Sequence, residues 1–420
     1  MRRRVFLALA FCACAPVSAA QSPATDPVVP RPSALLGASG DPAFLAWLDD
    51  FYGRALAAGF SSSSLQQAFS GLAPDPRVIA HDAVQPETAQ PISAYVARAV
   101  SAAAVERGRR KRAEVPQLAA IAQTYGVPAD ILVGLWSMET AFGVNQGDYD
   151  VVRALATLAA GDPRRRDWAE DELRACLKIL SDGSAGRAQL KGSWAGAMGQ
   201  TQLLPSTFLK DAVSAKGAGA PDIWGSPADA LASAANLLAA DGWRRGEGWA
   251  REVVTPPGFD FSLSEGPKAP PTWWRDKGVR PADGRPWSAA DAAADAQLIV
   301  PAGAAGPAFL ILPNHFVIRA YNNSLSYALA MGLFADRLSG GGLLVRPWPA
   351  ETPLSLSERF DAQTALAKLG YNPGTIDGLV GLGTRQALRA WQKAHGLVAD
   401  GYLTSPLVKR LAAEAGLGAS

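Results

Sequence analysis

The 420-residue sequence has few of the residues that ordinarily hold a catalytic metal. Its three histidines, His81, His315 and His395, are scattered, and none lies in an H-E-x-x-H pattern, which weakens a zinc-peptidase interpretation. Neither sign of charge is in excess, because 40 Lys and Arg face 38 Asp and Glu. Nothing in the overall balance therefore indicates a nucleic-acid partner.

Cysteine is equally scarce, and two of the three cysteines lie at the N-terminus. Residues 1–20, "MRRRVFLALAFCACAPVSAA", place three arginines before a short apolar run and a small-residue site, which predicts a secretory signal peptide and a periplasmic location. An uncleaved anchor, and with it membrane association, is the alternative. Cleavage would leave only Cys176, so no intramolecular disulfide could form, and its apolar helical context favours a buried structural thiol.

Composition divides the rest of the chain into four segments. Residues 21–38 are rich in Pro, Ala and Ser and predict a tether, whereas the pattern from 39 to 338 is mostly helical. Within it, residues 256–313 contain short β-like pieces such as "AQLIVP" and "AFLILP". Residues 339–356 predict a linker, and a compact tail occupies 357–415.

One carboxylate stands out in the apolar stretch "ILVGLWSMETAFG", residues 131–143. Helical spacing puts Leu132, Leu135 and Trp136 on the same face as Glu139, and Gly143 is a plausible helix terminator. A carboxylate on such a face loses water, which favours its protonated form, as a general acid requires. The alternative from this helix alone is a Glu at the edge of the stripe, pointing to solvent or paired with an arginine.

Two further stretches favour the functional interpretation. "LKGSWAGAMGQTQLLPSTF", residues 190–208, combines small residues that allow close backbone approach with the neutral polar side chains Ser193, Gln200, Thr201, Gln202 and Ser206. "VIRAYNNSLSYALAMG" adds Tyr321, Asn322 and Tyr327. Neutral amides, hydroxyls and aromatic faces suit a sugar chain with hydroxyl and N-acetyl groups.

The ordered set "SMETAFG", "KGSWAGAMGQTQLLPSTF" and "YNNSLSYALA" resembles the lytic transglycosylase B family, lysozyme-like enzymes that cleave the glycan strands of peptidoglycan. The resemblance implies a mainly α fold: a lysozyme-like helical catalytic domain, residues 39–338, with a small β-containing segment. It implies peptidoglycan glycan strands as the partner, leaves cell-wall synthesis or division proteins as possible further partners, and requires no cofactor.

The same resemblance implies the site residues. Glu139 would be the catalytic acid, Ser193 would lie beside it, Gln202 would hold sugar, and Tyr321 with Asn322 would line the cleft. Tyr327 is equally compatible with core packing. Some family members carry a D-x-D-x-D-G calcium loop, but "SAKGAGAPDIWGSP" offers only Asp222, so we predict that no metal binds there.

The tail resembles the three-helix peptidoglycan-binding domain, carried by Asp377-Gly378, Thr384, Trp391 and Asp400-Gly401. We interpret these residues as specifying the fold, with Leu388 and Trp391 in the core stripe.

Glycosidic bond cleavage usually takes two carboxylates, and the motifs supply one. The resemblance implies that Glu139 acts alone on the MurNAc–GlcNAc β-1,4 bond and leaves a 1,6-anhydroMurNAc end without using water. Two alternatives stay open. One is a hydrolytic muramidase with a second carboxylate such as Asp148 or Asp150; the other is a non-catalytic cell-wall-binding scaffold.

Overall fold

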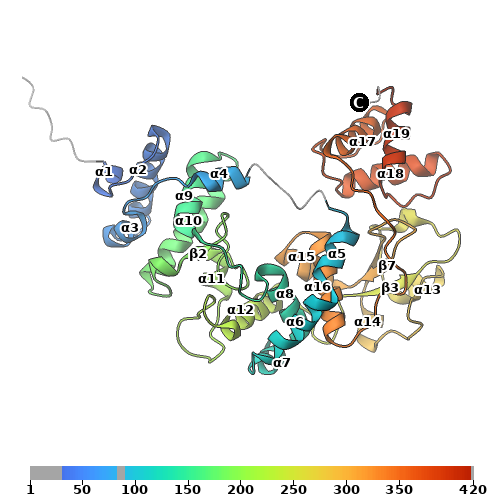
Figure 1. Ribbon diagram of the computed structural model, residues 1–420, viewed down its shortest axis with the longest axis horizontal. Coiled ribbons are helices and arrows are strands. Elements are labelled where there is room, and N and C mark those ends of the chain that lie inside the picture. The colour runs from blue at the N-terminus through green and yellow to red at the C-terminus, as the bar shows by residue number, and fades with distance from the viewer. Residues whose placement is uncertain (1–30, 83–89, 418–420) are drawn as a thin grey trace, which may run out of the picture.

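The computed structural model describes residues 31–82 and 90–417, and the predicted signal peptide lies outside them. Most of the described chain is helical (Figure 1). The first helical group packs around a core that includes Phe51, Phe69, Leu155 and Leu177, none of which is measurably exposed. Its members are α1 (Pro32–Leu35), α2 (Pro42–Ala57), α3 (Ser62–Phe69), α4 (Pro76–Asp82), α9 (Val151–Gly161), α10 (Arg166–Ser181) and α11 (Pro205–Asp211).

This group begins earlier than the sequence indicates. Residues 32–38 were predicted to belong to the tether, but α1 packs on α2, and the Ser33 amide donates to Asp49 Oδ1 at 2.7 Å. Leu36 is buried, and its carbonyl accepts from the amide of Gly71 at 2.8 Å. Burial of the apolar Leu36 side chain stabilises this segment against the first helical group, although its composition resembles that of a linker.

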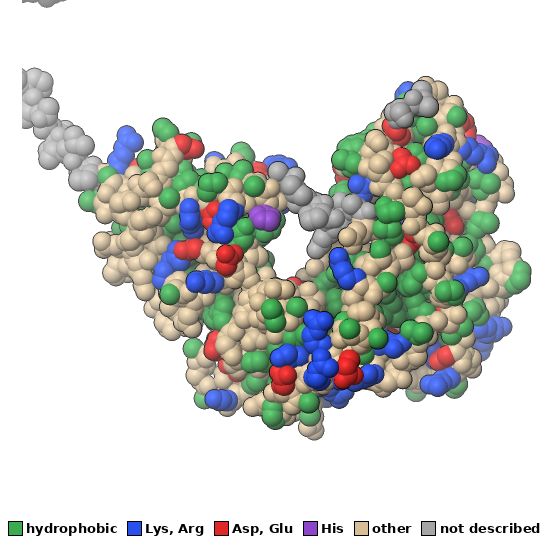
Figure 2. All heavy atoms as spheres, in the orientation of Figure 1, with side chains coloured by type: hydrophobic (Ala, Val, Ile, Leu, Met, Phe, Trp, Pro, Cys, Tyr) green, Lys and Arg blue, Asp and Glu red, His purple; other side chains and the backbone are tan. Residues whose placement is uncertain are grey.

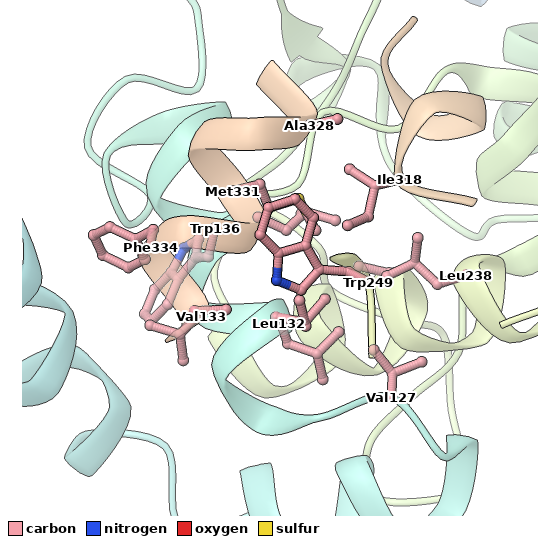
Figure 3. Packing of buried hydrophobic residues seen from close by; sticks show 14 of the residues in the cluster. Val127, Leu132, Val133, Trp136, Leu238, Trp249, Ile318, Ala328, Met331 and Phe334 are labelled. Atoms are coloured by element: carbon pink, nitrogen blue, oxygen red, sulfur yellow. The ribbon is translucent and has the colours of Figure 1, made fainter. Parts of the chain in front are cut away.

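The second helical group occupies the middle of the molecule (Figure 1). Its core holds Trp136, Met331 and Phe334 on one side and Trp249 among Leu132, Leu238 and Ile318 on the other (Figure 3). The helices are α5 (Ile92–Ala99), α6 (Ala102–Ala113), α7 (Leu118–Tyr125), α8 (Ala129–Thr140), α12 (Pro227–Ala240), α15 (Pro313–Tyr321) and α16 (Leu325–Leu338).

A five-stranded antiparallel sheet lies beside the second group, in the order β4-β6-β7-β3-β5. The strands are β3 (Ala250–Val254), β4 (Lys268–Ala269), β5 (Arg280–Pro281), β6 (Ala296–Ile299) and β7 (Ala308–Ile311), with α13 (Pro271–Asp276) and α14 (Ala289–Ala293) between them. The predicted pieces "AQLIVP" and "AFLILP" are β6 and β7, which confirms the small β-containing segment within a mainly α fold. All four side chains of β7 are buried, so this strand is a continuous apolar run, whereas β6 is interrupted by the half-buried Gln297.

The tail forms three helices, α17 (Leu356–Lys368), α18 (Leu382–Ala394) and α19 (Ser405–Glu414), next to the sheet (Figure 1). Leu366, Leu388, Trp391 and Leu411 are fully buried between them, which confirms the predicted core stripe. The Ser355 capping box fixes the start of α17.

No single helix in the described ranges is long and apolar enough to cross a membrane; α7 and α8 meet that test only as a pair bent by 108°.

Candidate active site

The C-terminal end of α8 presents Glu139. Leu132, Leu135 and Trp136 are buried on the same helix face, as predicted, while Glu139 itself is half-buried at the end of the stripe. The carboxylate is therefore partly desolvated but accessible from one side. An acid that must exchange protons with a ligand needs both properties.

The helix ends differently from the prediction. It stops at Thr140, not near Gly143, because Ala141 and Phe142 adopt left-handed backbone conformations with φ of 49° and 66°. Non-glycine residues pay for such conformations in free energy and keep them only where the surroundings hold them. Here the Thr140 hydroxyl accepts from the Gly143 amide at 2.8 Å and donates to the Gln200 carbonyl at 2.6 Å. The strained turn fixes the direction of the helix end that bears Glu139.

Tyr327, on α16, holds the carboxylate. Its hydroxyl donates to Glu139 Oε1 at 2.6 Å, and its side chain is almost wholly buried. Burial first and the charge of Glu139 second raise the pKa of Tyr327 well above its ordinary value, and the same causes raise the pKa of Tyr321. Both phenols stay protonated and can donate. Sequence reasoning left Tyr327 between packing and function, whereas the structure places its hydroxyl on the candidate acid.

The loop that carries Ser193 and Gln202 is built from tight backbone contacts. Strands β1 (Tyr149–Asp150) and β2 (Lys191–Gly192) pair antiparallel, and Met198 and Leu203 exchange two backbone hydrogen bonds. A Cβ on Gly192 would lie 2.0 Å from the Ala197 carbonyl oxygen, so only glycine fits. This confirms the expectation that small residues in the motif permit close backbone approach.

Hydrogen bonds join this loop to α8 and α15. Gln200 accepts from Trp136 Nε1 at 3.0 Å and donates to the Trp224 carbonyl at 3.1 Å. The Tyr321 hydroxyl donates to the Thr201 carbonyl. Motifs separated by more than a hundred residues therefore meet around the end of α8.

Three polar residues of the motif serve the fold rather than a ligand. Gln200 and Thr201 are buried, with Thr201 Oγ1 donating to the Ala230 carbonyl at 3.3 Å. Ser206 donates to Glu172 Oε1 at 2.7 Å. The sequence pattern indicated sugar contacts for all five polar side chains, but Gln200 and Thr201 are buried. Ser193 and Gln202 are half-exposed, and Ser206 is exposed with its hydroxyl bonded to Glu172.

Ser193 and Gln202 each have a polar group that can form a hydrogen bond with a ligand. Ser193 Oγ accepts from the Ala197 amide at 3.0 Å, which leaves its hydroxyl hydrogen to donate. Gln202 has a strained φ of 52°, and its Nε2 donates to the carbonyls of Gln146 and Gly199 at 3.1 and 2.9 Å. The Gln202 amide is thus oriented by the backbone, and its Oε1 can accept.

Asn322 immediately follows α15 and is half-buried. Its Oδ1 accepts from the Ser324 amide at 3.2 Å, so the side chain also shapes the turn between α15 and α16. The cleft-lining role implied by the resemblance stays a prediction for this residue.

The sequence did not predict the stacked aromatic surface next to Ser193. The Trp194 ring stacks on His81 with centroids 6.3 Å apart, and the Arg165 guanidinium lies 5.5 Å from its centroid. No local signal links these residues, because His81 lies on α4 and Arg165 precedes α10.

The two carboxylates suggested for the muramidase alternative have other contacts. Asp150 caps α9 by accepting from the Arg153 amide at 2.9 Å and pairs with Arg187 at 2.6 Å. Asp148 is exposed and pairs with Arg77 at 3.5 Å. Asp148 is therefore largely solvated, and Asp150 is occupied by structural contacts.

The loop that replaces the calcium motif is closed by its own hydrogen bonds. Asp222 Oδ1 accepts from the amides of Trp224 and Gly225, and Asp229 accepts from those of Ala215 and Asp222. Within the described ranges no group of three or more His, Cys, Asp or Glu is placed to hold a metal. The absence of bound calcium stays a prediction.

A half-buried carboxylate at a helix end, hydrogen-bonded to a buried tyrosine on a mostly helical scaffold, places this chain in the lysozyme-like class. The family description "Transglycosylase SLT domain" matches residues 43–336, and "Putative peptidoglycan binding domain" matches residues 355–411. The chain therefore belongs to the family of lytic transglycosylases with the SLT domain and carries a peptidoglycan-binding domain.

Individual relatives agree with this assignment. Membrane-bound lytic murein transglycosylase B of Escherichia coli (strain K12) is 35% identical over 216 residues, which are 50% of this chain and 56% of that protein. This chain thus spans just over half the length of that curated relative. SltB3 from Pseudomonas aeruginosa, solved with NAG-anhNAM-pentapeptide, has a TM-score of 0.84 and 44% identity, covering 88% of this chain and 100% of that one. Escherichia coli Slt35 with bulgecin A has a TM-score of 0.59 and 27% identity, covering 74% and 98%.

Proposed function

We propose that this protein is a periplasmic peptidoglycan lytic transglycosylase that cleaves the MurNAc–GlcNAc β-1,4 bond and leaves a 1,6-anhydroMurNAc end. The observation that carries the proposal is the Glu139 carboxylate, half-buried and hydrogen-bonded to Tyr327 at 2.6 Å. SltB3, the 44% identical relative, was solved with NAG-NAM-pentapeptide and with NAG-anhNAM-pentapeptide, which are peptidoglycan fragments.

In the proposed reaction Glu139 first acts as an acid. It gives its proton to the glycosidic oxygen, the bond from that oxygen to C1 of MurNAc breaks, and GlcNAc leaves with a free hydroxyl. The N-acetyl carbonyl of MurNAc stabilises the cationic C1 by bonding to it. Tyr327 donates to the carboxylate that results, which favours the loss of the proton at that moment.

Glu139 then acts as a base. It takes the proton of the C6 hydroxyl, and O6 displaces the acetamide oxygen from C1 to close the anhydro ring. The protonated form of Glu139 is regenerated and no water is consumed. Ser193 would donate to the acetamide or orient Glu139, and Gln202 would accept from a sugar hydroxyl, while Tyr321 and Asn322 would line the sugar path.

The contacts of Asp148 and Asp150 favour this scheme over hydrolysis. A hydrolytic base must hold a water near C1. Asp150 is engaged with Arg187 and the start of α9, and Asp148 is 81% exposed. The predicted signal peptide at residues 1–20 and the peptidoglycan-binding domain support action at the cell wall after export.

Glu139→Gln tests the assignment of the acid. The amide is nearly isosteric and keeps the Tyr327 contact, so the variant should fold with an unchanged melting temperature. It should lose at least about 10⁴-fold of its activity on purified sacculi, the upper end for general acid–base catalysis, because one residue serves both steps. A folded variant that retains more than a few per cent of the wild-type rate would refute the role of Glu139.

A further inference from the structure

Helix α6 has a strongly basic outer surface. Its buried side is small: Val105 is buried, and a Cβ on Gly108 would lie 2.8 Å from the Phe334 ring. Figure 2 shows basic side chains gathered over this helix, with a few acidic ones among them. We call the cluster the basic face; its members on α6 are Arg107, Arg109, Arg110, Lys111 and Arg112.

Acidic residues on α6 neutralise the basic face only in part. Glu106 lies 3.5 Å from Arg109 and 3.6 Å from Arg110, and Glu114 lies 2.6 Å from Lys111. Both glutamates are more than half exposed, and ion pairs in water contribute little because solvent and salt screen them. The basic side chains can therefore exchange these partners for other anions.

Neighbouring elements do not cancel the surplus of positive charge. Arg112 pairs with Asp130 at 2.8 Å, and Arg245 donates to two carbonyls at the end of α7. Arg337, whose carbonyl accepts from the basic face at 3.1 Å, is offset by Asp336. Seven basic residues thus meet four acidic ones here, whereas the whole chain has 40 Lys and Arg against 38 Asp and Glu. Such a local surplus attracts a polyanionic surface.

The basic face lies at the opposite end of two helices from the candidate active site. Helix α8 runs from Asp130, which pairs with the basic face, to Glu139 near its C-terminal end. Helix α16 begins near Tyr327, which holds Glu139, and ends beside the basic face at Arg337. At about 1.5 Å per residue, each helix separates the two regions by roughly 14 Å. A partner on the basic face would therefore leave the site open.

An exposed apolar side chain follows α16 on the same side. The Gly341 amide donates to the Asp336 carbonyl at 2.7 Å, which holds the chain near the end of the helix. Two residues later Leu343 is 83% exposed, the highest value among the large apolar side chains of residues 31–82 and 90–417. Basic residues beside an exposed leucine match an anionic lipid surface, where headgroups take the charges and the leucine leaves water. A water-soluble polyanion would leave Leu343 solvated.

We propose that the basic face, together with Leu343, docks this protein on an anionic phospholipid membrane. The docking goes beyond the proposed cleavage reaction and does not involve residues 1–20. It would hold the protein at the membrane surface with Glu139 directed away from the lipid.

Vesicle sedimentation measures the docking of residues 21–420, because residues 1–20 would insert into lipid by themselves. The vesicles are phosphatidylethanolamine mixed with phosphatidylglycerol, and phosphatidylcholine alone, each at low and high salt. The double variant Arg107→Gln/Arg110→Gln removes two exposed charges, and glutamine favours a helix, so its melting temperature should be unchanged. The control Arg275→Gln/Lys368→Gln removes the same charge from exposed positions on α13 and α17.

We expect the wild type to bind the phosphatidylglycerol vesicles, to leave them at high salt and not to bind phosphatidylcholine. The α6 double variant should bind about 30-fold more weakly, at about five-fold per basic residue near the surface. Leu343→Ser should bind about ten-fold more weakly, because an apolar contact is lost. The control should bind like the wild type.

Equal binding by the two double variants, or equal binding to the two kinds of vesicle, would overturn the proposal. Binding to lipid-free sacculi that is weakened by Arg107→Gln/Arg110→Gln would assign the basic face to the wall and would also overturn it. All variants should cleave soluble glycan fragments at the wild-type rate. Vesicle binding needs no cleavage, so a protein that docks on vesicles but leaves glycan intact would refute the proposed function alone.

Discussion

Acid should destabilise this protein through His315, a fully buried histidine on α15, the helix that also ends at Tyr321. The imidazole stacks on Trp249 with centroids 6.0 Å apart, and within the described chain neither ring nitrogen has a hydrogen-bond partner. Burial, with a smaller contribution from the charge of Arg319, lowers the pKa of His315 from 6.5 to about 3. His315 is therefore neutral in the folded protein at pH 5, where the unfolded chain protonates it.

The sign and size of the effect follow from linkage. A histidine whose pKa is depressed by folding contributes stability above its unfolded pKa, and that stability is lost as the pH falls from 6.5 towards 3. Between pH 6.5 and pH 5 the loss is about 2 kcal/mol, at 1.36 kcal/mol per unit of pKa difference. His315→Phe keeps a ring on Trp249 but cannot take a proton, so this part of the acid sensitivity should disappear.

The assay is urea unfolding of the catalytic domain, followed by tryptophan fluorescence at pH 7 and pH 5. The free energy of unfolding should fall by about 2 kcal/mol less on acidification in His315→Phe than in the wild type. His81→Phe changes an exposed histidine and should retain the wild-type loss. Identical losses in His315→Phe and the wild type would show that His315 is not the source of this acid sensitivity.

Three further outcomes are expected. Tyr327→Phe should fold normally but lower kcat on glycan about 10- to 100-fold, because a hydrogen bond to a charged group is lost. A rate within two-fold of wild type in a steady-state assay would contradict this. Gly332→Ala should lower the free energy of unfolding by about 1–3 kcal/mol in urea titrations, because its Cβ would lie 2.3 Å from the Trp249 ring. The control Gly53→Ala adds a Cβ that meets nothing within 4 Å and should leave the stability unchanged. Equal stability of the two variants would contradict the tight packing of Gly332 on Trp249. Removal of residues 355–417 should reduce activity on insoluble sacculi more than on soluble glycan fragments, because wall binding raises the local substrate concentration; equal losses would make that domain purely structural.

Local patterns predicted the parts of this protein that depend on local physics. The spacing of Leu132, Leu135 and Trp136 predicted a buried helix face, and the apolar pieces around 296–311 predicted strands. The resemblance selected Glu139 and the three-helix tail. These features can be predicted because they depend only on neighbouring residues or on a complete motif.

Long-range contacts could not be predicted in the same way. The bond from Tyr327 to Glu139 spans 188 positions, and a tyrosine on an apolar helix has the same pattern whether or not its hydroxyl finds a carboxylate. Gln200 matched a sugar-binding pattern, yet Trp136 and Trp224 occupy its amide. The end of α8 at Thr140 depends on the bond to Gln200, so the distant loop decided where the helix stops.

Mass spectrometry of sacculi digested by the wild-type protein, before and after borohydride treatment, distinguishes the non-hydrolytic reaction from hydrolysis. We predict disaccharide products one water lighter than hydrolytic ones and unchanged by borohydride, because an anhydro ring has no reducing end. Products that carry a reducing MurNAc end and gain two hydrogens on treatment would contradict it and would require a water-activating group in addition to Glu139.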